Sequence, residues 1–246
     1  MPPVSPDHGR LIRHLESIAD LRDNDRAALG TLPLRIRSVA DKRDILREGS
    51  KPAEACLILT GIAGRYKVVA GGRRQIVSLH LPGDLPDLVS LYLPVIDHSL
   101  VALTPVRVAF FAHDPIRNLI KSSPVIEEAM LRSAFIDSSI HREWVANVGR
   151  RTAIERIAHV ICETFTRMRA LGLVQQTTFE LPLTQGAIGD ITGLSSVHVN
   201  RTLKELRTRG LIDTNGNVHS ILDWESLQEV GDFDPAYLHL KRQDSL

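Results

Sequence analysis

Apolar positions recur along the chain with different spacings, and each spacing predicts a different kind of element. Between residues 11 and 32 they recur every three to four positions around a polar stretch at 20–25, which predicts two short helices. Between residues 34 and 112 they form short runs separated by glycine or proline, which predicts strands. The runs are 55–59, 66–69, 76–81, 99–103 and 106–111. We therefore expect two helices followed by a compact β unit.

Two details of the β unit indicate hairpins that close into a roll. Ala70-Gly71-Gly72 supplies the positive-φ positions that a tight turn between strands needs. Side chains of the run 106–111 alternate, with Val106, Val108 and Phe110 on one face.

A long helix is predicted after the β unit, because residues 125–148 contain neither glycine nor proline. A stripe near heptad spacing follows it and consists of Ile126, Met130, Ser133, Ile140 and Trp144. Two interpretations stay open for this stripe: a seam between two copies of the helix, or packing against the chain's own β unit. Gly149 then interrupts the pattern, and a second helix is expected from Thr152 to about Ala170.

The segment 181–222 has the pattern of a helix-turn-helix followed by a hairpin. Thr184 and Ser195 are suitable N-caps for two short helices, and Gly193 lies where the turn needs a left-handed residue. In the second helix the apolar side chains Val199, Leu203 and Leu206 share one face. The opposite face carries Val197, Asn200, Arg201, Lys204 and Thr208. After Gly210, the pair Asn215-Gly216 predicts a type I′ hairpin, which would form a wing.

The chemistry of that polar face suits DNA. The arginine fork matches guanine O6 and N7, asparagine can bond base edges or phosphate, and lysine reaches backbone oxygens. Residues 149–212 hold nine basic and five acidic side chains, net +4, whereas residues 213–246 hold two and seven, net −5. We therefore expect local contact with double-stranded DNA, with Arg201 as the principal base-reading residue.

Composition excludes several other classes. The chain of 246 residues has 30 basic and 29 acidic side chains, so no global field attracts polyanions or membranes. It has no apolar run long enough for a membrane span and no signal-peptide pattern, so we expect a cytoplasmic protein. Its two cysteines, Cys56 and Cys162, exclude a disulfide framework, a four-thiolate iron-sulfur site and a cysteine-rich zinc site, and both are expected in the core.

An enzyme is not expected, and neither is a metal or a cofactor. The cupins, which also use β-rolls, need a His-x-His pair with a following glutamate, whereas this chain has only His80-Leu81-Pro82 at a comparable place. No serine-histidine-aspartate elbow, phosphate-binding glycine loop or paired-carboxylate motif is present.

In these features the chain resembles the Crp/Fnr family of transcription regulators, and within it the Fnr/FixK-like branch without iron-sulfur cysteines. The resemblance covers nearly the whole chain and includes the Leu81-Pro82-Gly83-Asp84 step, the entry 151–158 to the C-terminal part, and the whole segment 183–212, which is the most specific of these. It implies an α+β fold with a cyclic-nucleotide-binding-like β-roll (jelly roll), a long dimerisation helix and a winged helix-turn-helix. The corresponding parts are 1–123, 124–148 and 149–246. It also implies a homodimer on a palindromic site and contact with RNA polymerase.

The candidate DNA-contacting residues are Thr184, Gln185, Ser195, Ser196, Val197, His198, Asn200, Arg201 and Lys204. Among them, Ser196, Val197, Asn200 and Arg201 match the base-facing positions of the family. Arg201 matches the arginine that contacts guanine. Val197 departs from the glutamate that usually accepts from cytosine N4, so we expect a half-site that keeps the guanine and differs at the glutamate-read position.

The effector region departs further from the cyclic-AMP binders of the family. Those binders use Gly-Glu at the start of a phosphate cassette and Arg-Ser or Arg-Thr near its end. Here the candidate pocket residues are Gly83, Asp84, Leu85, Asp87, His98 and Ser99. Pro86 removes a backbone donor, Asp87 repels phosphate, and no arginine lies in the stretch. We expect no control by cyclic AMP.

One alternative function stays open at this point. The chain could be a receiver for a small molecule such as a cyclic nucleotide or haem, with His80 or His98 as candidate haem ligands, whose DNA binding depends on that ligand or has been lost. The sequence identifies neither an effector nor the direction of regulation.

Overall fold

The computed structural model describes residues 5–241. The chain folds into two compact units. The N-terminal unit comprises residues 5–67, Leu79–Ser138 and 240–241, and the C-terminal unit comprises Val68–Ser78 and Ser139–His239. The boundary expected at Gly149 remains a prediction. None of the described helices is long and apolar enough to cross a membrane.

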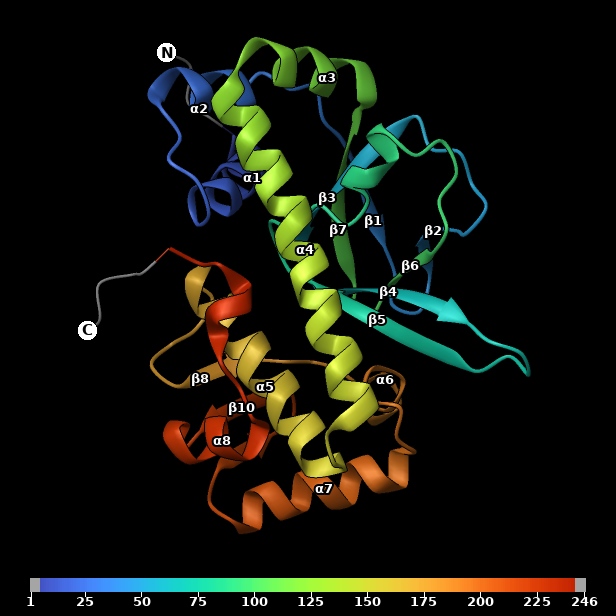
Figure 1. Ribbon diagram of the computed structural model, residues 1–246, viewed down its shortest axis with the longest axis vertical. Helices are drawn as coiled ribbons and strands as arrows, with labels where there is room; N and C mark the ends of the chain where they lie inside the picture. Colours follow the sequence, from blue (N-terminus) through green and yellow to red (C-terminus); the bar gives the residue numbers. More distant parts are fainter. Residues whose placement is uncertain (1–4, 242–246) are drawn as a thin grey trace. The chain divides into compact units, whose positions relative to one another are not determined.

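The N-terminal unit begins with two helices and continues as antiparallel sheet, as the apolar pattern predicts (Figure 1). The elements up to α3 are α1 Pro6–Glu16, α2 Asp23–Leu29, β1 Arg35–Val39, β2 Asp44–Leu46, β3 Glu54–Thr60, β4 Ala63–Val68, β5 Arg74–His80, η1 Leu88–Leu91, β6 Ser99–Ala102, β7 Val106–Ala112 and α3 His113–Ser122. Of these, β5 lies mostly in the C-terminal unit. The five predicted runs correspond to β3, β4, β5, β6 and β7.

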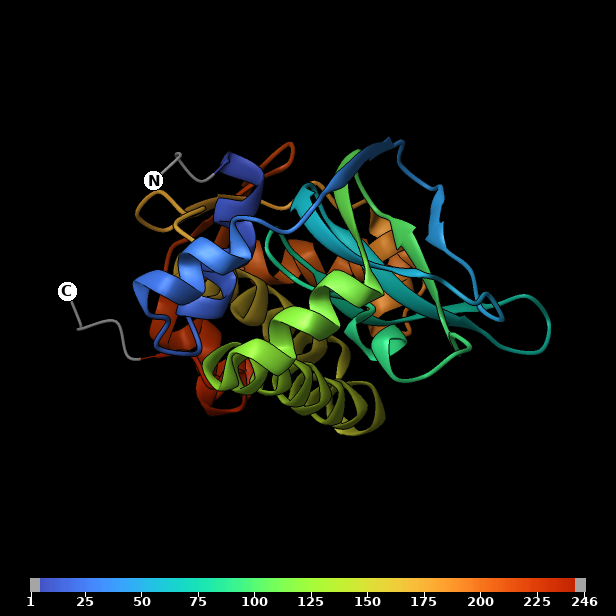
Figure 2. The same cartoon turned by 90° about the horizontal axis from the view of Figure 1, so that it is seen from above.

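The strands form two sheets, with orders β1-β7-β3 and β2-β6-β4-β5. Between the sheets lies a small apolar core that includes Cys56, Ile58, Leu100 and Phe110. A larger core joins β3, β7 and η1 to α1, α2, α3 and the start of α4, and Figure 2 shows the leading helices on one side of this unit and the strands on the other. The predicted hairpin forms between β4 and β5, where Gly71 and Gly72 have φ of 84° and 76°.

The Leu81-Pro82-Gly83-Asp84 step is held against β3. The N–H of Gly83 donates to the carbonyl of Ile58 at 2.7 Å, and the N–H of Ile58 donates to the carbonyl of Asp84 at 3.0 Å. The Asp84 carboxylate closes the turn by accepting from the N–H of Leu81 at 2.8 Å. These bonds fix the chain that enters the candidate effector region.

The helix α4, Pro124–Arg150, covers the predicted residues and continues through Gly149, where the sequence predicted an interruption. Ser123 begins it, because its hydroxyl accepts from the N–H of Ile126 and donates to the buried carboxylate of Asp25. The predicted stripe turns inward: Ile126 and Met130 lie in the large core, and Ile140 and Trp144 are also buried within the chain. The stripe is therefore not a free dimer seam. Ile126 and Met130 pack against the β unit, as the second interpretation expects, whereas the indole of Trp144 bonds Glu163 in the C-terminal unit.

The C-terminal unit contains the remaining helices and a small sheet. Its elements are α5 Ala153–Ala170, β8 Thr178–Glu180, α6 Gln185–Thr192, α7 Ser196–Thr208, β9 Ile212–Asn215, β10 Val218–Ile221, α8 Trp224–Gly231 and η2 Pro235–Leu238. The Glu155 carboxylate accepts from the N–H of Thr152 at 2.6 Å and so fixes the start of α5. The sheet order is β8-β10-β9, and together these elements complete an α+β fold.

Candidate nucleic-acid interface

The helices α6 and α7 are capped as the sequence predicts. The hydroxyl of Thr184 accepts from the N–H of Ala187 at 3.1 Å, and that of Ser195 accepts from the N–H of His198 at 3.3 Å. Each cap satisfies one backbone donor of a first turn that has no partner within the helix. The two caps thus fix the residues at which α6 and α7 begin.

The turn between these helices requires glycine at two positions. Gly193 ends α6 in the left-handed region, with φ of 70°. A Cβ at Gly189 would lie 2.5 Å from the carbonyl oxygen of Leu194, closer than side chains tolerate. The two helices therefore pack closely at the turn because residue 189 has no side chain.

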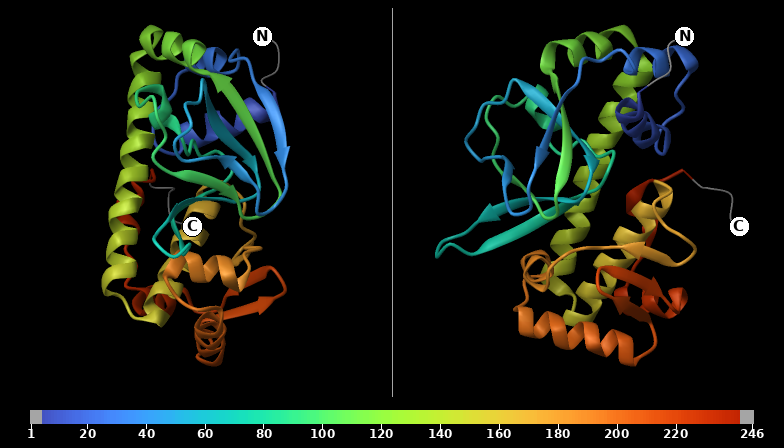
Figure 3. Two further views of the ribbon diagram at one scale, coloured as in Figure 1. Left: turned by 90° about the vertical axis from the view of Figure 1, so that its right-hand side faces the viewer. Right: turned by 180° about the vertical axis from the view of Figure 1, so that it is seen from behind.

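The helix α7 has the predicted division into two faces. Val199, Leu203 and Leu206 are buried, together with Thr202, which the pattern did not assign to the core. Val197 is 81% exposed at the start of the opposite face. Figure 3 shows α7, in orange, along the outer rim of the C-terminal unit.

All nine candidate DNA-contacting residues lie at the surface. Eight are exposed, namely Thr184, Gln185, Ser195, Ser196, Val197, Asn200, Arg201 and Lys204, and His198 is half-buried. Within residues 5–241, neither Arg201 nor Lys204 has an ion pair or hydrogen bond through its side chain. Further along the helix Arg209 pairs with Glu205 at 2.5 Å. The two cations at the centre of the exposed face are thus available to phosphate or base edges.

The wing forms with a turn shifted by one residue from the prediction. Asn215 pairs with Val218, so the two loop residues are Gly216 and Asn217. Gly216 has φ of 60°, whereas Asn215 keeps a negative φ, so the turn has glycine at its first central position, as in type II′. The type I′ prediction was wrong because β9 extends through Asn215. The short strand β8 adds a third strand that the sequence did not predict.

The start of β5 belongs to the same unit and contacts α6. Arg74 donates from Nε and Nη2 to the Asp190 carboxylate at 2.8 and 2.6 Å. The side-chain amide of Gln75 donates to the carbonyl of Ile191 at 3.0 Å. The helix-turn-helix is therefore supported by a segment more than a hundred residues earlier in the chain.

The candidate effector residues do not all gather at one place. Asp87 and His98 lie near Arg65, whose charge acts on both. Asp84 lies instead beside His14 and His80, with N···O distances of 3.5 and 3.9 Å, and Gly83 precedes it in the same turn. Leu85 is buried in the large core. The hydroxyl of Ser99 accepts from the N–H of Glu48 at 3.0 Å, so it holds the strand edge.

The candidate effector region contains a buried arginine, Arg65, that the sequence analysis did not single out. Arg65 on β4 forms an ion pair of 2.8 Å with Asp137 on α4 and also donates to the carbonyl of Pro86. The phosphate-cassette stretch itself has no arginine, yet the strand beside it supplies one. The signal in the sequence was a charged residue at an inward position of a short strand.

The pKa values of Asp87 and His98 are both shifted from their ordinary values. Burial raises the pKa of Asp87 to about 6, although its carboxylate accepts from the N–H of Cys56 at 2.7 Å. Burial, and next the positive charge of Arg65, lower the pKa of His98, whose Nδ1 bonds the Asp97 carboxylate at 2.9 Å. In the described chain the Nε2 atom of His98 has no hydrogen-bond partner.

Both cysteines are buried. Burial raises the pKa of the Cys56 and Cys162 thiols, so both are protonated at neutral pH. They act as small apolar side chains of the two units.

Comparison with known proteins agrees with this architecture. Residues 155–230 match the model of the Crp-like helix-turn-helix domain, and residues 36–123 match that of the cyclic nucleotide-binding domain. The chain is 31% identical to the nitrogen fixation regulation protein FixK of Bradyrhizobium diazoefficiens over 168 residues, which cover 68% of this chain and 69% of FixK.

The chain belongs to the Crp/Fnr family. Within the family it lies with the FixK- and Fnr-type proteins. It is 29% identical over 226 residues, 90% of each chain, to the transcriptional activator protein FnrL of Cereibacter sphaeroides. Among solved structures it is similar to FixK2 from Bradyrhizobium japonicum, with a TM-score of 0.71 and 23% identity over 81% of this chain and 98% of FixK2. The Crp/Fnr fold predicted from the sequence is thus confirmed.

Proposed function

We propose that this chain is a sequence-specific DNA-binding transcription regulator that acts as a homodimer on a palindromic site without cyclic AMP. The observation that carries the proposal is the exposed face of α7, where Arg201 and Lys204 have no acidic partner within the described residues. A helix of this kind fits the major groove, where arginine reads guanine and lysine contacts the backbone.

The nine surface residues divide into two roles. Ser196, Val197, Asn200 and Arg201 face the bases, with Arg201 on guanine. Thr184, Gln185, Ser195, His198 and Lys204 contact the phosphate backbone, since helix N-termini and short polar side chains are suited to bind phosphate. The contacts to phosphate position the helix, and the contacts to bases select the sequence.

The exposed face of α4 supports a homodimer. Residues Leu131, Phe135, Ser138, Arg142 and Val145 follow a strict heptad spacing of four and three, and all are exposed. We call this set the α4 seam. Leu131, Phe135 and Val145 are 43%, 68% and 75% exposed, although apolar side chains of this size are normally buried. Two α4 helices in parallel would bury the seam and would place both copies of α7 at the same end, as a palindrome requires.

The buried cluster around Arg65 supports independence from cyclic AMP. A cyclic phosphate needs a free cation and backbone donors, but the Arg65 guanidinium is already bound by Asp137 and by the carbonyl of Pro86. Asp87 would add a carboxylate beside the phosphate. The residues present therefore do not fit a cyclic nucleotide.

The names of the relatives support a direction of regulation. FnrL is described as a transcriptional activator, and we propose that this chain also activates transcription and contacts RNA polymerase. The alternative, a small-molecule receiver whose DNA module is lost, is disfavoured by the exposed and unpaired Arg201. A ligand-dependent regulator remains compatible with the buried, unpartnered Nε2 of His98.

A gel-shift assay with inverted half-sites and purified protein tests the proposal. We expect binding without any added effector and its loss in the Arg201→Ala/Lys204→Ala variant. The matched control is Arg47→Ala, which removes an exposed charge from the N-terminal unit. Equal binding by the double variant and the wild type would contradict the proposed role of α7.

A further inference from the structure

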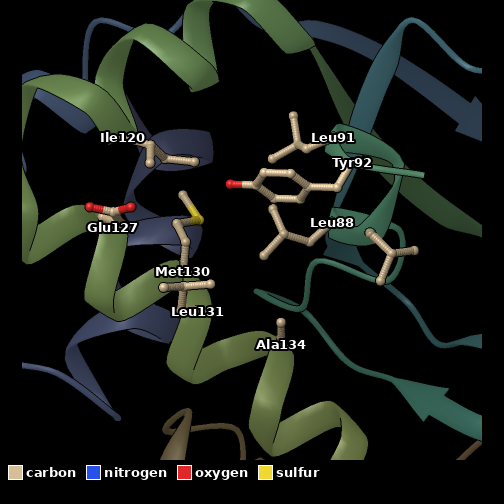
Figure 4. A pocket seen from close by; sticks show the side chains of 9 residues that line it. Leu88, Leu91, Tyr92, Ile120, Glu127, Met130, Leu131 and Ala134 are labelled. Atoms are coloured by element: carbon tan, nitrogen blue, oxygen red, sulfur yellow. The ribbon is translucent and has the colours of Figure 1, made fainter. Parts of the chain in front are cut away.

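An apolar pocket opens beside α4 in the N-terminal unit (Figure 4). One wall comes from η1 and the residue after it, including Val89 and Tyr92. The other comes from α3 and α4, including Met130, Leu131 and Ala134. The volume is about 100 Å³, and Glu127 is the one ionisable carboxylate in the lining. The pocket therefore favours an uncharged, apolar occupant.

The rim of the pocket is unusually apolar for a protein surface. Tyr92 is 67% exposed, and Val89, Leu93 and Val95 are exposed beside it. Leu131 and Phe135 continue the apolar surface along α4. Exposed apolar side chains that gather in one place are typical of an interaction site. Val89, Tyr92 and Leu131 line the pocket and are exposed, so we expect a partner to cover it.

The register of the α4 seam identifies that partner. In a parallel pair of helices each seam residue of one helix inserts between four residues of the other. For a residue at position 135, heptad geometry places those four at positions 131, 134, 135 and 138. Leu131 and Ala134 belong both to this group and to the wall of the pocket.

We infer that Phe135 of the partner subunit inserts its ring into this pocket when two copies pair through the α4 seam. The inference rests on the homodimer of the proposed function and extends the dimer contact from α4 to η1. A dry apolar cavity of about 150 Å³ in another protein accepts benzene. The pocket here is smaller, about 100 Å³, but it is open at one side, so it need take only part of an aromatic ring. By two-fold symmetry both pockets are filled, each by the other chain.

This arrangement accounts for both the exposed Phe135 and the pocket. Phe135 is not covered within the single chain. Phe135 of the same chain does not line the pocket. The ring that fills it therefore comes from a second copy, and the inserted ring also covers the exposed face of Tyr92.

Sedimentation equilibrium of the full chain without DNA tests the inference through a double-mutant cycle. We expect Phe135→Ala to weaken the dimer by about tenfold to a hundredfold, as for a buried aromatic anchor. Ala134→Phe fills the pocket from its own chain and also weakens the dimer, because it excludes the partner's ring. The combined variant Ala134→Phe/Phe135→Ala dimerises more tightly than the two single effects predict when added, since the clash is removed. Ile36→Ala removes an exposed apolar side chain from β1 and should change nothing.

The outcomes separate this inference from the proposed function. Wild-type dimerisation that is unaffected by Phe135→Ala overturns the inference alone. Strictly additive effects place Phe135 on the seam but outside the pocket and also overturn it. A wild-type chain that stays monomeric overturns both the inference and the homodimer. Circular dichroism of each variant verifies folding, which we expect to persist because Phe135 is exposed in the single chain.

Discussion

The carboxylate of Glu163 on α5 accepts a hydrogen bond from the indole Nε1 of Trp144 on α4 at 2.9 Å, and both side chains are buried. The same carboxylate accepts from the Tyr237 hydroxyl at 2.8 Å and pairs with Arg167 at 3.2 Å. One buried charge thus joins the second half of α4 to α5 and to η2. The helix that carries the seam and the domain that carries α7 share this contact.

Glu163→Ala should destabilise the chain by about 3 kcal/mol or more, because it leaves the indole, the phenol and Arg167 without their common acceptor. Urea unfolding of the full chain measures the change. Glu225→Ala, at an exposed position of α8, is the control and should shift the free energy of unfolding by less than about 0.5 kcal/mol. Equal effects at the two positions would contradict the structural role of Glu163.

The buried Asp87 should make stability depend on pH in a specific direction. Its pKa in the folded chain is raised to about 6 by burial, above its ordinary value. Between the ordinary pKa of an aspartate and pH 6, Asp87 binds more protons in the folded chain than in the unfolded chain. The contribution of Asp87 to the free energy of unfolding therefore falls as the pH rises and levels off above pH 6. The free energy of unfolding changes by at most about 3 kcal/mol, because the pKa of Asp87 differs by about two between the folded and the unfolded chain.

Unfolding of wild type and Asp87→Asn at a series of pH values isolates this contribution. The variant should gain stability relative to the wild type as pH rises from 4 to 7. The histidines act in the opposite direction in both proteins, because burial lowers the pKa of His98, His113, His159 and His219. Their common contribution is lost as pH falls below about 6.5, and it cancels in the difference. A difference that stays constant with pH would rule out the titration of Asp87.

Two glycines of α6 should respond oppositely to the same substitution. Gly189→Ala places a Cβ 2.5 Å from the carbonyl oxygen of Leu194 and should cost about 1–3 kcal/mol and weaken DNA binding. Gly186→Ala meets only the Thr184 hydroxyl at 3.8 Å and should stabilise the helix by about 0.5–1 kcal/mol. Thermal unfolding and gel shifts of both variants measure these effects, and a harmless Gly189→Ala would show that the turn can relax.

Val197→Glu should change sequence preference without changing stability. Val197 is largely exposed, so the free energy of unfolding should move by less than about 0.5 kcal/mol. A carboxylate there can accept from cytosine N4, whereas valine offers only apolar contact. Selection from randomised half-sites should return a cytosine at one position with the variant and not with the wild type. Identical selected sites would remove Val197 from the base-facing set.

The sequence predicted most of the helix-turn-helix because its determinants are local. Two caps, a left-handed glycine and the two faces of α7 are each encoded within a few residues, and the structure has all of them. The wing turn was misplaced by one residue, since Asn215 is equally able to end a strand. The short strands β1, β2 and β8 lack an apolar run, and their ladders come from partners distant in the sequence.

The long helix shows what periodicity cannot decide. The helix α4 carries two apolar stripes, and the pattern does not say which one its own chain buries. Ile126, Met130 and Trp144 contact the chain's own cores and leave the seam of Leu131 and Phe135 exposed. Arg65 was missed for a similar reason, because its partner Asp137 lies 72 positions later.

The pair of Arg65 and Asp137 limits how any signal can enter the N-terminal unit. An anion that entered this interior would compete with the Asp137 carboxylate of α4 for the Arg65 guanidinium. The chain thus carries its own competitor for anions, the Asp137 carboxylate. The stronger its ion pair with Arg65, the higher the concentration at which an anionic ligand would bind there.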